Sequence, residues 1–206
     1  MKKIAIALTA LFATLGTAQA QTAVQAPTAV QAQTTAPTPA PLRFFIGLGK
    51  SAGGDSLITL PYENGGAVSI YAGGAGYVTF GADYRLMPDF SLQGSVNYHV
   101  VKMDANNGSI KFERYPIELI GYYQISPAWR AGAGLRYSIN PRLIGDGVVS
   151  NVRGNYDDSI GAIVEGEFFA TRRIGIKLRL VKETIKLPGY GNYDGSHVGL
   201  SGNFYF

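Results

Sequence analysis

The sequence predicts an all-β fold, an eight-stranded antiparallel up-and-down transmembrane β-barrel. From residue 42 onward, apolar and polar side chains alternate with a period of two, which is the period of a strand with one apolar face. No stretch after residue 20 repeats apolar residues at the spacing of a helix. The segments between the predicted strands are alternately short and longer on average, which is typical of transmembrane barrels.

The first 41 residues are predicted to lie outside the barrel. Residues 1–20 combine a basic start, "MKK", a short apolar run and the small residues Ala18 and Ala20, which indicates a signal peptide cleaved after Ala20. Residues 21–41 contain no charge and repeat "TAVQA", a composition that predicts a disordered segment rich in Ala, Thr, Pro and Gln. This segment is either a plain spacer or a periplasmic tether. The barrel is expected over residues 42–206.

Composition excludes several classes of function. The sequence has 18 basic and 14 acidic residues, and without Lys2 and Lys3 its charge falls to about +2. No basic stripe interleaved with aromatic residues supports binding to nucleic acid. The sequence has no cysteine, which excludes disulfides, thiol redox chemistry and cysteine-ligated metal sites.

The first four strands are predicted at 43–50, 70–85, 90–100 and 110–125. In "FSLQGSVNYHV" one face carries only apolar side chains and glycine, while the other carries polar ones. The second strand has small residues on both faces, which indicates either strong curvature with close packing or local bulges. Apolar residues that share a face in these strands include Phe44, Ile46, Leu48, Ile70, Val78, Phe80, Phe90, Leu92, Val96, Tyr115, Ile117 and Leu119.

The last four strands are predicted at 129–140, 157–170, 173–187 and 197–206 by the same alternation. Their shared apolar faces include Trp129, Leu135, Tyr137, Ile160, Val164, Phe168, Ile174, Ile176, Leu178, Leu180, Val198, Leu200, Phe204 and Phe206. Connections at 86–89, 126–128 and 170–173 are short, whereas 51–69, 105–109, 141–156 and 188–196 are expected to be the loops of the other end. All short turns therefore lie at one end of the sheet.

Three features place the apolar face toward lipid rather than around a ligand, as it would be in a soluble barrel. The apolar faces are unbroken, aromatic side chains gather near strand ends, and the polar faces carry charges of both signs. We expect Glu165 and Glu167 to meet Lys177 and Arg179, and Glu118 to meet Arg130, inside a filled lumen. The predicted lumen charges are Asp83, Glu118, Arg130, Arg136, Glu165, Glu167, Lys177 and Arg179.

The predicted aromatic girdles lie at the two ends of the apolar face. The girdle near the short turns comprises Phe44, Tyr84, Phe90, Tyr123, Trp129, Phe168, Phe204 and Phe206. The opposite girdle is expected to comprise Tyr98, Tyr115 and Tyr137.

The signal peptide, the eight amphipathic strands and the terminal "GLSGNFYF" resemble the small bacterial outer-membrane β-barrels, such as the OmpA transmembrane domain, OmpX and opacity-type proteins. The resemblance covers 42–206 and implies a Gram-negative outer membrane, a periplasmic N-terminus and extracellular long loops. It also implies that the barrel-assembly machinery reads an assembly signal at Leu200, Gly202, Phe204 and Phe206, with Gly202 the weakest match. The last strand should pair with the first.

No residue pattern predicts catalysis or a cofactor. Some barrels of this kind modify lipid A, but the His-x-Ser pair expected of a deacylase is absent, because His197 is followed by Val198 and Gly199. His99 is expected to be a hydrogen-bonded lumen residue. Asp157, Asp158 and Asp194 carry oxygen ligands suited to calcium, but solvated turn residues are the favoured interpretation. We therefore expect no enzyme activity and no metal site.

The resemblance implies outer-membrane lipid and lipopolysaccharide as surroundings, and we expect a monomer. Five basic residues near the long-loop end are candidates for contact with lipopolysaccharide phosphates or, alternatively, for a solvated rim: Lys102, Lys111, Arg114, Lys182 and Lys186. The favoured function is structural or surface interaction, with specificity in loops 51–69 and 141–156. The alternative is a narrow, porin-like or OmpW-like transport route, and a lipid A enzyme is less favoured.

Overall fold

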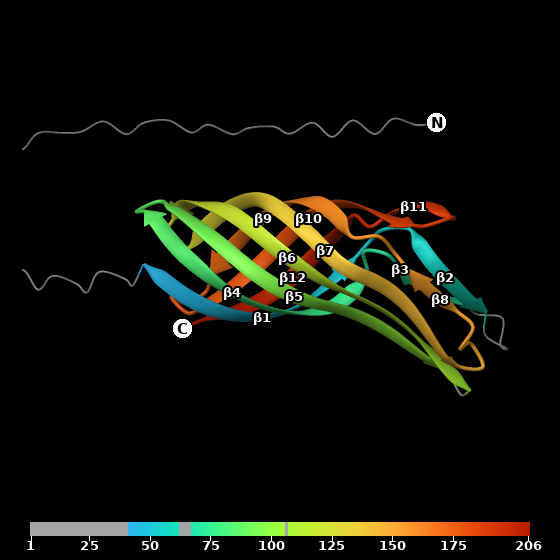
Figure 1. Ribbon diagram of the computed structural model, residues 1–206. Coiled ribbons are helices and arrows are strands. Elements are labelled where there is room, and N and C mark those ends of the chain that lie inside the picture. Colours follow the sequence, from blue (N-terminus) through green and yellow to red (C-terminus); the bar gives the residue numbers. More distant parts are fainter. Residues whose placement is uncertain (1–40, 62–66, 106) are drawn as a thin grey trace, which may run out of the picture. The chain divides into compact units, whose positions relative to one another are not determined.

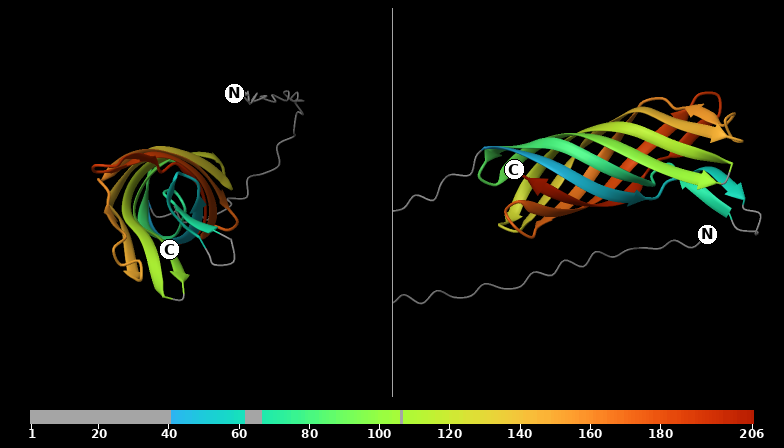
Figure 2. Two further views of the ribbon diagram at one scale, coloured as in Figure 1. Left: turned by 90° about the vertical axis from the view of Figure 1, so that its right-hand side faces the viewer. Right: turned by 90° about the horizontal axis from the view of Figure 1, so that it is seen from below.

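Eight antiparallel strands close into a barrel. The computed structural model describes residues 41–61, 67–105 and 107–206; the expected signal peptide and the segment up to residue 40 lie outside them. Around the ring the order is β1 (Leu42–Ala52), β4 (Ala75–Met87), β5 (Phe90–Ala105), β6 (Gly108–Ser126), β7 (Trp129–Gly147), β9 (Ser159–Phe169), β10 (Ile174–Leu187) and β12 (His197–Tyr205), which returns to β1 (Figures 1 and 2). The predicted fold class is confirmed.

The C-terminal strand closes the ring against the first strand, as predicted. The register between β1 and β12 runs from the pair Ala52 and Val198 to the pair Phe45 and Tyr205. Beyond it, the N–H of Phe206 donates to the carbonyl of Phe44 over 3.0 Å, and the N–H of Phe44 donates to the carbonyl of Phe206 over 3.2 Å. The last aromatic residue is therefore held by backbone hydrogen bonds, and the ring has no open edge between these strands.

The predicted second strand, 70–85, is in fact two strands. β3 (Ala67–Tyr71) pairs with β2 (Ser56–Pro61) in a separate hairpin, and the chain turns before β4 begins at Ala75. Gly73 lies in this turn, where a β-carbon would come within 2.7 Å of the β-carbon of His197. The hydroxyl of Ser51 donates to the carbonyl of Gly73 over 2.7 Å and holds the turn beside β1. Long-range packing therefore overrides the continuous alternation.

Other segments predicted as loops also contain strands. β7 continues to Gly147, seven residues beyond its predicted end, and pairs there with β8 (Arg153–Asn155). β11 (Gly191–Asp194) folds back on β10. The long-loop end is therefore an extension of the sheet, visible in Figure 1 at the side where β2, β3, β8 and β11 gather.

This extension encloses an apolar core, which we call the apolar cap. At the long-loop end, where β6 and β7 extend past the closed ring, the inward side chains are apolar instead of charged. Side chains from the wall, the β2–β3 hairpin and the connections pack together there. The buried members of the apolar cap are Ile70, Ala72, Ile110, Phe112, Leu143, Tyr156 and Ile185.

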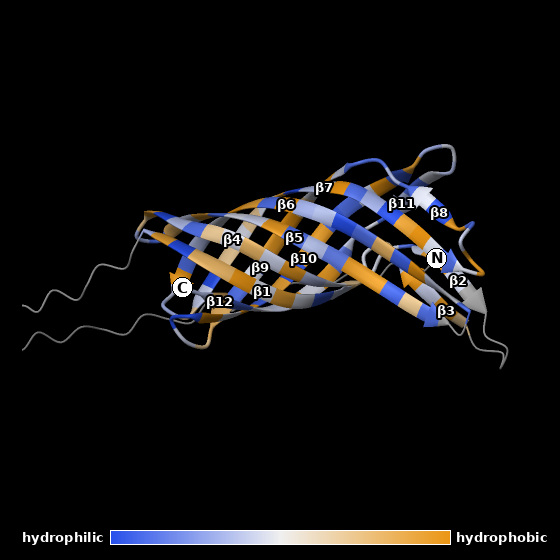
Figure 3. Ribbon diagram, turned by 60° about the horizontal axis from the view of Figure 1, so that its bottom comes forward, coloured by the Kyte–Doolittle hydropathy of each residue, from blue (hydrophilic) through white to orange (hydrophobic). Residues whose placement is uncertain are grey.

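The outer wall of the barrel is a continuous apolar surface. Along β10 the outward side chains from Ile174 to Leu180 are all aliphatic, and Leu178 is 54% exposed. Figure 3 shows the alternation of hydrophobic and hydrophilic residues along the strands. The residues that the structure describes include no helix long and apolar enough to cross a membrane.

Aromatic side chains frame this surface at both predicted levels. Near the short turns, Trp129 packs on Phe168 with ring centroids 4.9 Å apart, and Phe44 stacks on Phe206 at 6.4 Å. At the other level Tyr98 stacks on Tyr115 at 5.2 Å. The nine residues from Phe90 to Tyr98 in β5 match the length of about 9–11 residues that a tilted strand needs to cross a bilayer.

We expect an arginine at Leu178 or Val164 to block membrane assembly. Both side chains face outward from the middle of the wall, with 54% and 58% exposure, and a cation placed in hydrocarbon there costs about 2–4 kcal/mol. Ser150, in the turn before β8, supplies the matched control, Ser150→Arg. Folding into lipid vesicles, followed by the mobility shift of unheated samples, measures the effect. Equal folding of all three variants would contradict the assignment of faces.

Candidate functional site: a series of ion pairs through the barrel

The inward faces of the barrel carry charged side chains that are withdrawn from solvent. All eight predicted lumen charges are buried, each with no more than 3% exposure. Burying an ion costs several kcal/mol unless it is paired and hydrogen-bonded. The pairing of these groups therefore decides whether the lumen is stable and what it can do.

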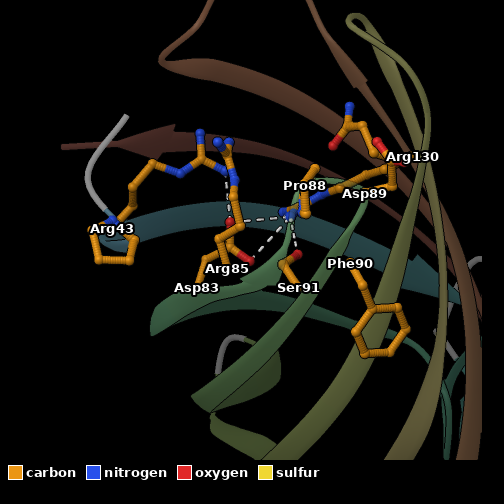
Figure 4. Close-up of a pocket in the computed structure, with 10 residues that line it drawn as sticks. Arg43, Asp83, Arg85, Pro88, Asp89, Phe90, Ser91 and Arg130 are labelled. Atoms are coloured by element: carbon orange, nitrogen blue, oxygen red, sulfur yellow. Dashed lines mark hydrogen bonds and ion pairs between the residues drawn. The ribbon is translucent and has the colours of Figure 1, made fainter. Parts of the chain in front are cut away.

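At the short-turn end, Asp83 and Arg130 form the first pairs. Arg43 donates to Asp83 over 2.6 Å, and Arg130 donates to the same carboxylate over 3.1 Å. Arg130 also donates to Ser91 over 3.3 Å (Figure 4). These groups line a pocket of only about 20 Å³, which is room for about one water molecule. Side chains thus fill this mouth of the lumen.

In the middle of the barrel, acids and bases alternate. Arg130 contacts Glu167 at 2.6 Å, and Lys177 lies 4.0 Å from Glu167 and 2.9 Å from Glu165. Arg179 then joins Glu165 at 2.8 Å to Glu118 at 3.1 Å. Hydrogen bonds from Tyr205 to Glu167 and from Tyr122 to Glu165 complete this layer.

At the long-loop end, two arginines share one carboxylate. Arg136 lies 3.5 Å from Glu118 and 3.5 Å from Glu183, and Arg114 lies 3.2 Å from Glu183. Ser159 donates to Glu183 over 2.7 Å. Arg114 is the last charged residue before the apolar cap, and its guanidinium carbon lies 6.0 Å from the centre of the Phe112 ring.

Together these contacts form one connected set, which we call the lumen ion-pair series. Each of its five carboxylates contacts two cations, and the sign of the charge alternates along it. In order from the short-turn end, the series is Arg43, Asp83, Arg130, Glu167, Lys177, Glu165, Arg179, Glu118, Arg136, Glu183 and Arg114. Because the sign of the charge alternates, each buried carboxylate has two cations to offset the cost of removing it from water.

The register explains which predicted pairs form. Lys177 and Arg179 lie directly opposite Glu167 and Glu165 on neighbouring strands, as expected. The predicted pair of Glu118 with Arg130 is wrong. Glu118 faces Arg136 across the β6–β7 pair, whereas the partner of Arg130 in this register is Gln124.

Three members of the series were not predicted as lumen residues: two were missed, and one was assigned to the outer surface. Glu183 shares the parity of Lys177 and Arg179 in its strand, and this signal could have identified it as a lumen residue. Arg43 likewise lies on the inward face of β1. Arg114 was predicted to contact lipopolysaccharide, but it is fully buried and paired with Glu183, so this assignment is wrong.

The four lysines of the predicted lipopolysaccharide group lie at the long-loop end outside the lumen. Lys102 is paired with Asp104 at 2.7 Å, and Lys182 lies 3.6 Å from Asp194. Lys111 lies 2.9 Å from Glu113, and Lys186 is exposed on the same strand as Lys182. These cations follow the last outward apolar residues of their strands.

His197 and Asp158 are held by hydrogen bonds, whereas the prediction that His99 is hydrogen-bonded is wrong, because both its ring nitrogens are buried without a partner within the described ranges of the chain. The Nδ1 of His197 bonds the carbonyl of Gly195 over 2.8 Å, and its Nε2 lies 3.2 Å from Arg136. Asp158 accepts from the backbone N–H of Asn140 and from Tyr137, and these bonds lower its pKa below the usual range. Among the described residues, no three acidic or histidine side chains gather in a way that could hold a metal ion.

Comparisons with solved structures support the fold alone. The chain is similar to Ail, the attachment invasion locus protein of Yersinia pestis, with a TM-score of 0.54 and 11% identity over 80% of this chain and 97% of that one. A second structure of Ail, in complex with the heparin analogue sucrose octasulfate, gives a TM-score of 0.52 and 12% identity over the same shares of the two chains. Neisserial surface protein A gives a TM-score of 0.52 and 11% identity over 81% of this chain and 97% of that one.

The barrel therefore has the fold of the small outer-membrane β-barrels, as the resemblance predicted. No family model matches the sequence, and no curated protein matches it.

We expect Arg179→Met to destabilise the barrel by about 3–5 kcal/mol, because the substitution leaves two buried carboxylates with one cation each. Urea unfolding in lipid vesicles measures the loss. The control Lys102→Met removes an exposed pair, which is worth about 0–1 kcal/mol. Similar losses for both variants would contradict the role of the lumen ion-pair series.

Proposed function

We propose that the protein is an integral outer-membrane β-barrel of a Gram-negative bacterium, with a filled lumen and a structural or surface-interaction role. Its N-terminus would lie in the periplasm and its long-loop end at the cell surface. The observation that carries this proposal is the lumen ion-pair series, which occupies the interior of a barrel whose outer wall is apolar. Such a wall needs hydrocarbon as its solvent.

The filled lumen favours a structural role over transport. Three layers oppose the passage of solutes: the Arg43–Asp83–Arg130 contacts at one mouth, the central ion pairs and the apolar cap. Opening a path would separate buried charges from their partners, which is costly. The protein would therefore act through its outer surfaces rather than through a channel.

The long-loop end is the proposed contact region. Loops 51–69 and 141–156 contribute the β2–β3 hairpin and β8 there. Apolar side chains stand exposed at this end, including Tyr71 at 49%, Val148 at 72% and Tyr190 at 81%. Exposed aromatic and aliphatic groups on a rigid support are suited to contact with another molecule.

Lipopolysaccharide is the proposed lipid partner of the lysines at this end. Lys102, Lys182 and Lys186 are exposed where the apolar wall ends, and Lys111 is half-buried. In the membrane, their ammonium groups would lie at the same depth as the anionic phosphates of lipopolysaccharide. The barrel-assembly machinery would recognise Leu200, Gly202, Phe204 and Phe206 during biogenesis, and the folded protein would be a monomer.

A matched pair of variants tests this orientation. Lys182→Gln combined with Lys186→Gln removes two cations at the long-loop end of β10, whereas Arg172→Gln combined with Arg173→Gln removes two at its other end. We expect only the first pair to weaken binding of purified lipopolysaccharide to protein in nanodiscs. A larger loss from the arginine pair would reverse the proposed orientation.

Gel mobility and planar-bilayer recordings test the proposed function. We expect the refolded protein to need detergent or lipid, to migrate differently before and after boiling, and to give no steady conductance. A soluble, detergent-independent protein would contradict the membrane proposal. Steady conductance that Glu165→Gln or Arg179→Met abolishes would instead support a narrow pore.

The proposed role is non-enzymatic, and mass spectrometry of lipid A can test this. Cells with and without the protein should give the same acyl pattern. An altered pattern would support the lipid A enzyme instead.

A further inference from the structure

The lumen ion-pair series carries one more cation than carboxylate. Six basic groups alternate with five acidic ones, so the series begins and ends with an arginine. Arg43, at the short-turn end, is 28% exposed and can be hydrated. Arg114, at the other end, is fully buried. Without the partly exposed Arg43, the buried part of the series has five cations and five carboxylates. At its long-loop end, however, Arg114 and Arg136 share the carboxylate of Glu183, so two buried guanidinium groups lie beside one anion there.

Polar atoms without partners gather at this same end. In the part of the chain that the structure describes, Nε and Nη2 of Arg114, Nη2 of Arg136, both ring nitrogens of His99 and the hydroxyl of Tyr77 are buried and lack hydrogen-bond partners. Buried polar groups are normally paired, and an unpaired N–H costs about 1–3 kcal/mol. Four side chains with the same deficit need a common explanation.

Strand register brings these four side chains together. Tyr77 lies opposite His99 on β4 and β5, and their rings stack with centroids 4.6 Å apart. His99 lies opposite Arg114 on β5 and β6. Arg114 and Arg136 both contact Glu183, at 3.2 and 3.5 Å. The unpaired groups of Arg114, Arg136 and His99 therefore lie near Glu183. Tyr77 stacks on His99 at the edge of this cluster, on the side of Arg179, whose guanidinium carbon lies 5.6 Å from the centre of the Tyr77 ring.

The chemistry of this cluster selects an anion. Guanidinium groups carry only donors, and a neutral histidine and a tyrosine hydroxyl can each donate one hydrogen bond. A metal cation would be repelled by two arginines. A water molecule could satisfy donors, but it would add no negative charge beside the two guanidinium groups that share Glu183.

We propose that Arg114, Arg136 and His99 form a binding site for a small inorganic anion, of the size and charge of chloride, inside the barrel, with Tyr77 stacked on His99 at its edge. The anion would accept from the free guanidinium N–H groups and lie beside the two arginines that share Glu183. Because the apolar cap covers the site, the ion would enter during folding and exchange slowly. This site is independent of the proposed surface role.

Bromide serves as the probe, because it resembles chloride and scatters anomalously. The full mature protein is refolded into detergent in bromide buffer and then passed through a column equilibrated in halide-free acetate buffer. X-ray fluorescence measures the bromine retained per protein chain, and anomalous diffraction from crystals locates it. We expect a bromide ion in each chain, within hydrogen-bond distance of Arg114 and Arg136.

Charge-matched variants separate the site from nonspecific binding. Arg114→Gln removes one of the two guanidinium groups at the site, and we expect retained bromide to fall to background. Arg43→Gln removes a cation at the opposite end of the series, and retention should stay unchanged. Glu183→Gln removes the negative charge that Arg114 and Arg136 share, so bromide retention should stay at the wild-type level or its release should become slower.

Wild-type crystals decide the proposal even where a variant fails to fold. An anomalous peak in the cluster supports it. A wild-type lumen without a bromide peak, or with water alone beside Arg114, would overturn it. Equal retention by folded Arg114→Gln and Arg43→Gln proteins would overturn it as well.

Discussion

The alternation of charge inside the barrel is the interaction on which the rest of the structure depends. Each carboxylate of the lumen ion-pair series contacts two cations, and most of the cations contact two carboxylates. Removing a single member leaves a buried ion undercompensated. The series thus links strands far apart in sequence: Asp83 of β4, Arg130 of β7 and Glu167 of β9 meet because the barrel is closed.

The two ends of the lumen have different surroundings. At the short-turn end Arg43 remains partly exposed, so its charge is hydrated. At the long-loop end the wall strands extend past the ring and enclose apolar side chains such as Phe112 and Ile185. A polar interior therefore ends against an apolar one, and Arg114 lies at this boundary. The unpaired donors of Arg114 and Arg136 lie at this boundary.

Close packing in the lumen requires small residues opposite large ones. Phe45 is fully buried and lies over Gly81, where a β-carbon would approach the ring to 2.5 Å. Glycines in the predicted second strand therefore serve close packing at Gly81, as one interpretation predicted, and a chain reversal at Gly73, which neither interpretation predicted. The small residues on the inner face leave room for the large charged side chains that fill the interior.

Sequence alternation determined that eight strands form the ring, which of their faces is apolar and that the predicted lumen charges are buried, whereas the closing pair of β1 and β12 followed from the family resemblance. The alternation placed Ile70 and Ala72 on the outer face, but both are buried in the apolar cap. It could have placed Glu183 and Arg114 inward, because both share the parity of neighbouring lumen charges. Only the tertiary structure decided which charges meet, the break before β4 and the strands within the long loops. The face on which a side chain lies depends on the alternation along its own strand. The charge that it meets depends on the register between strands and on barrel closure, which no single segment encodes.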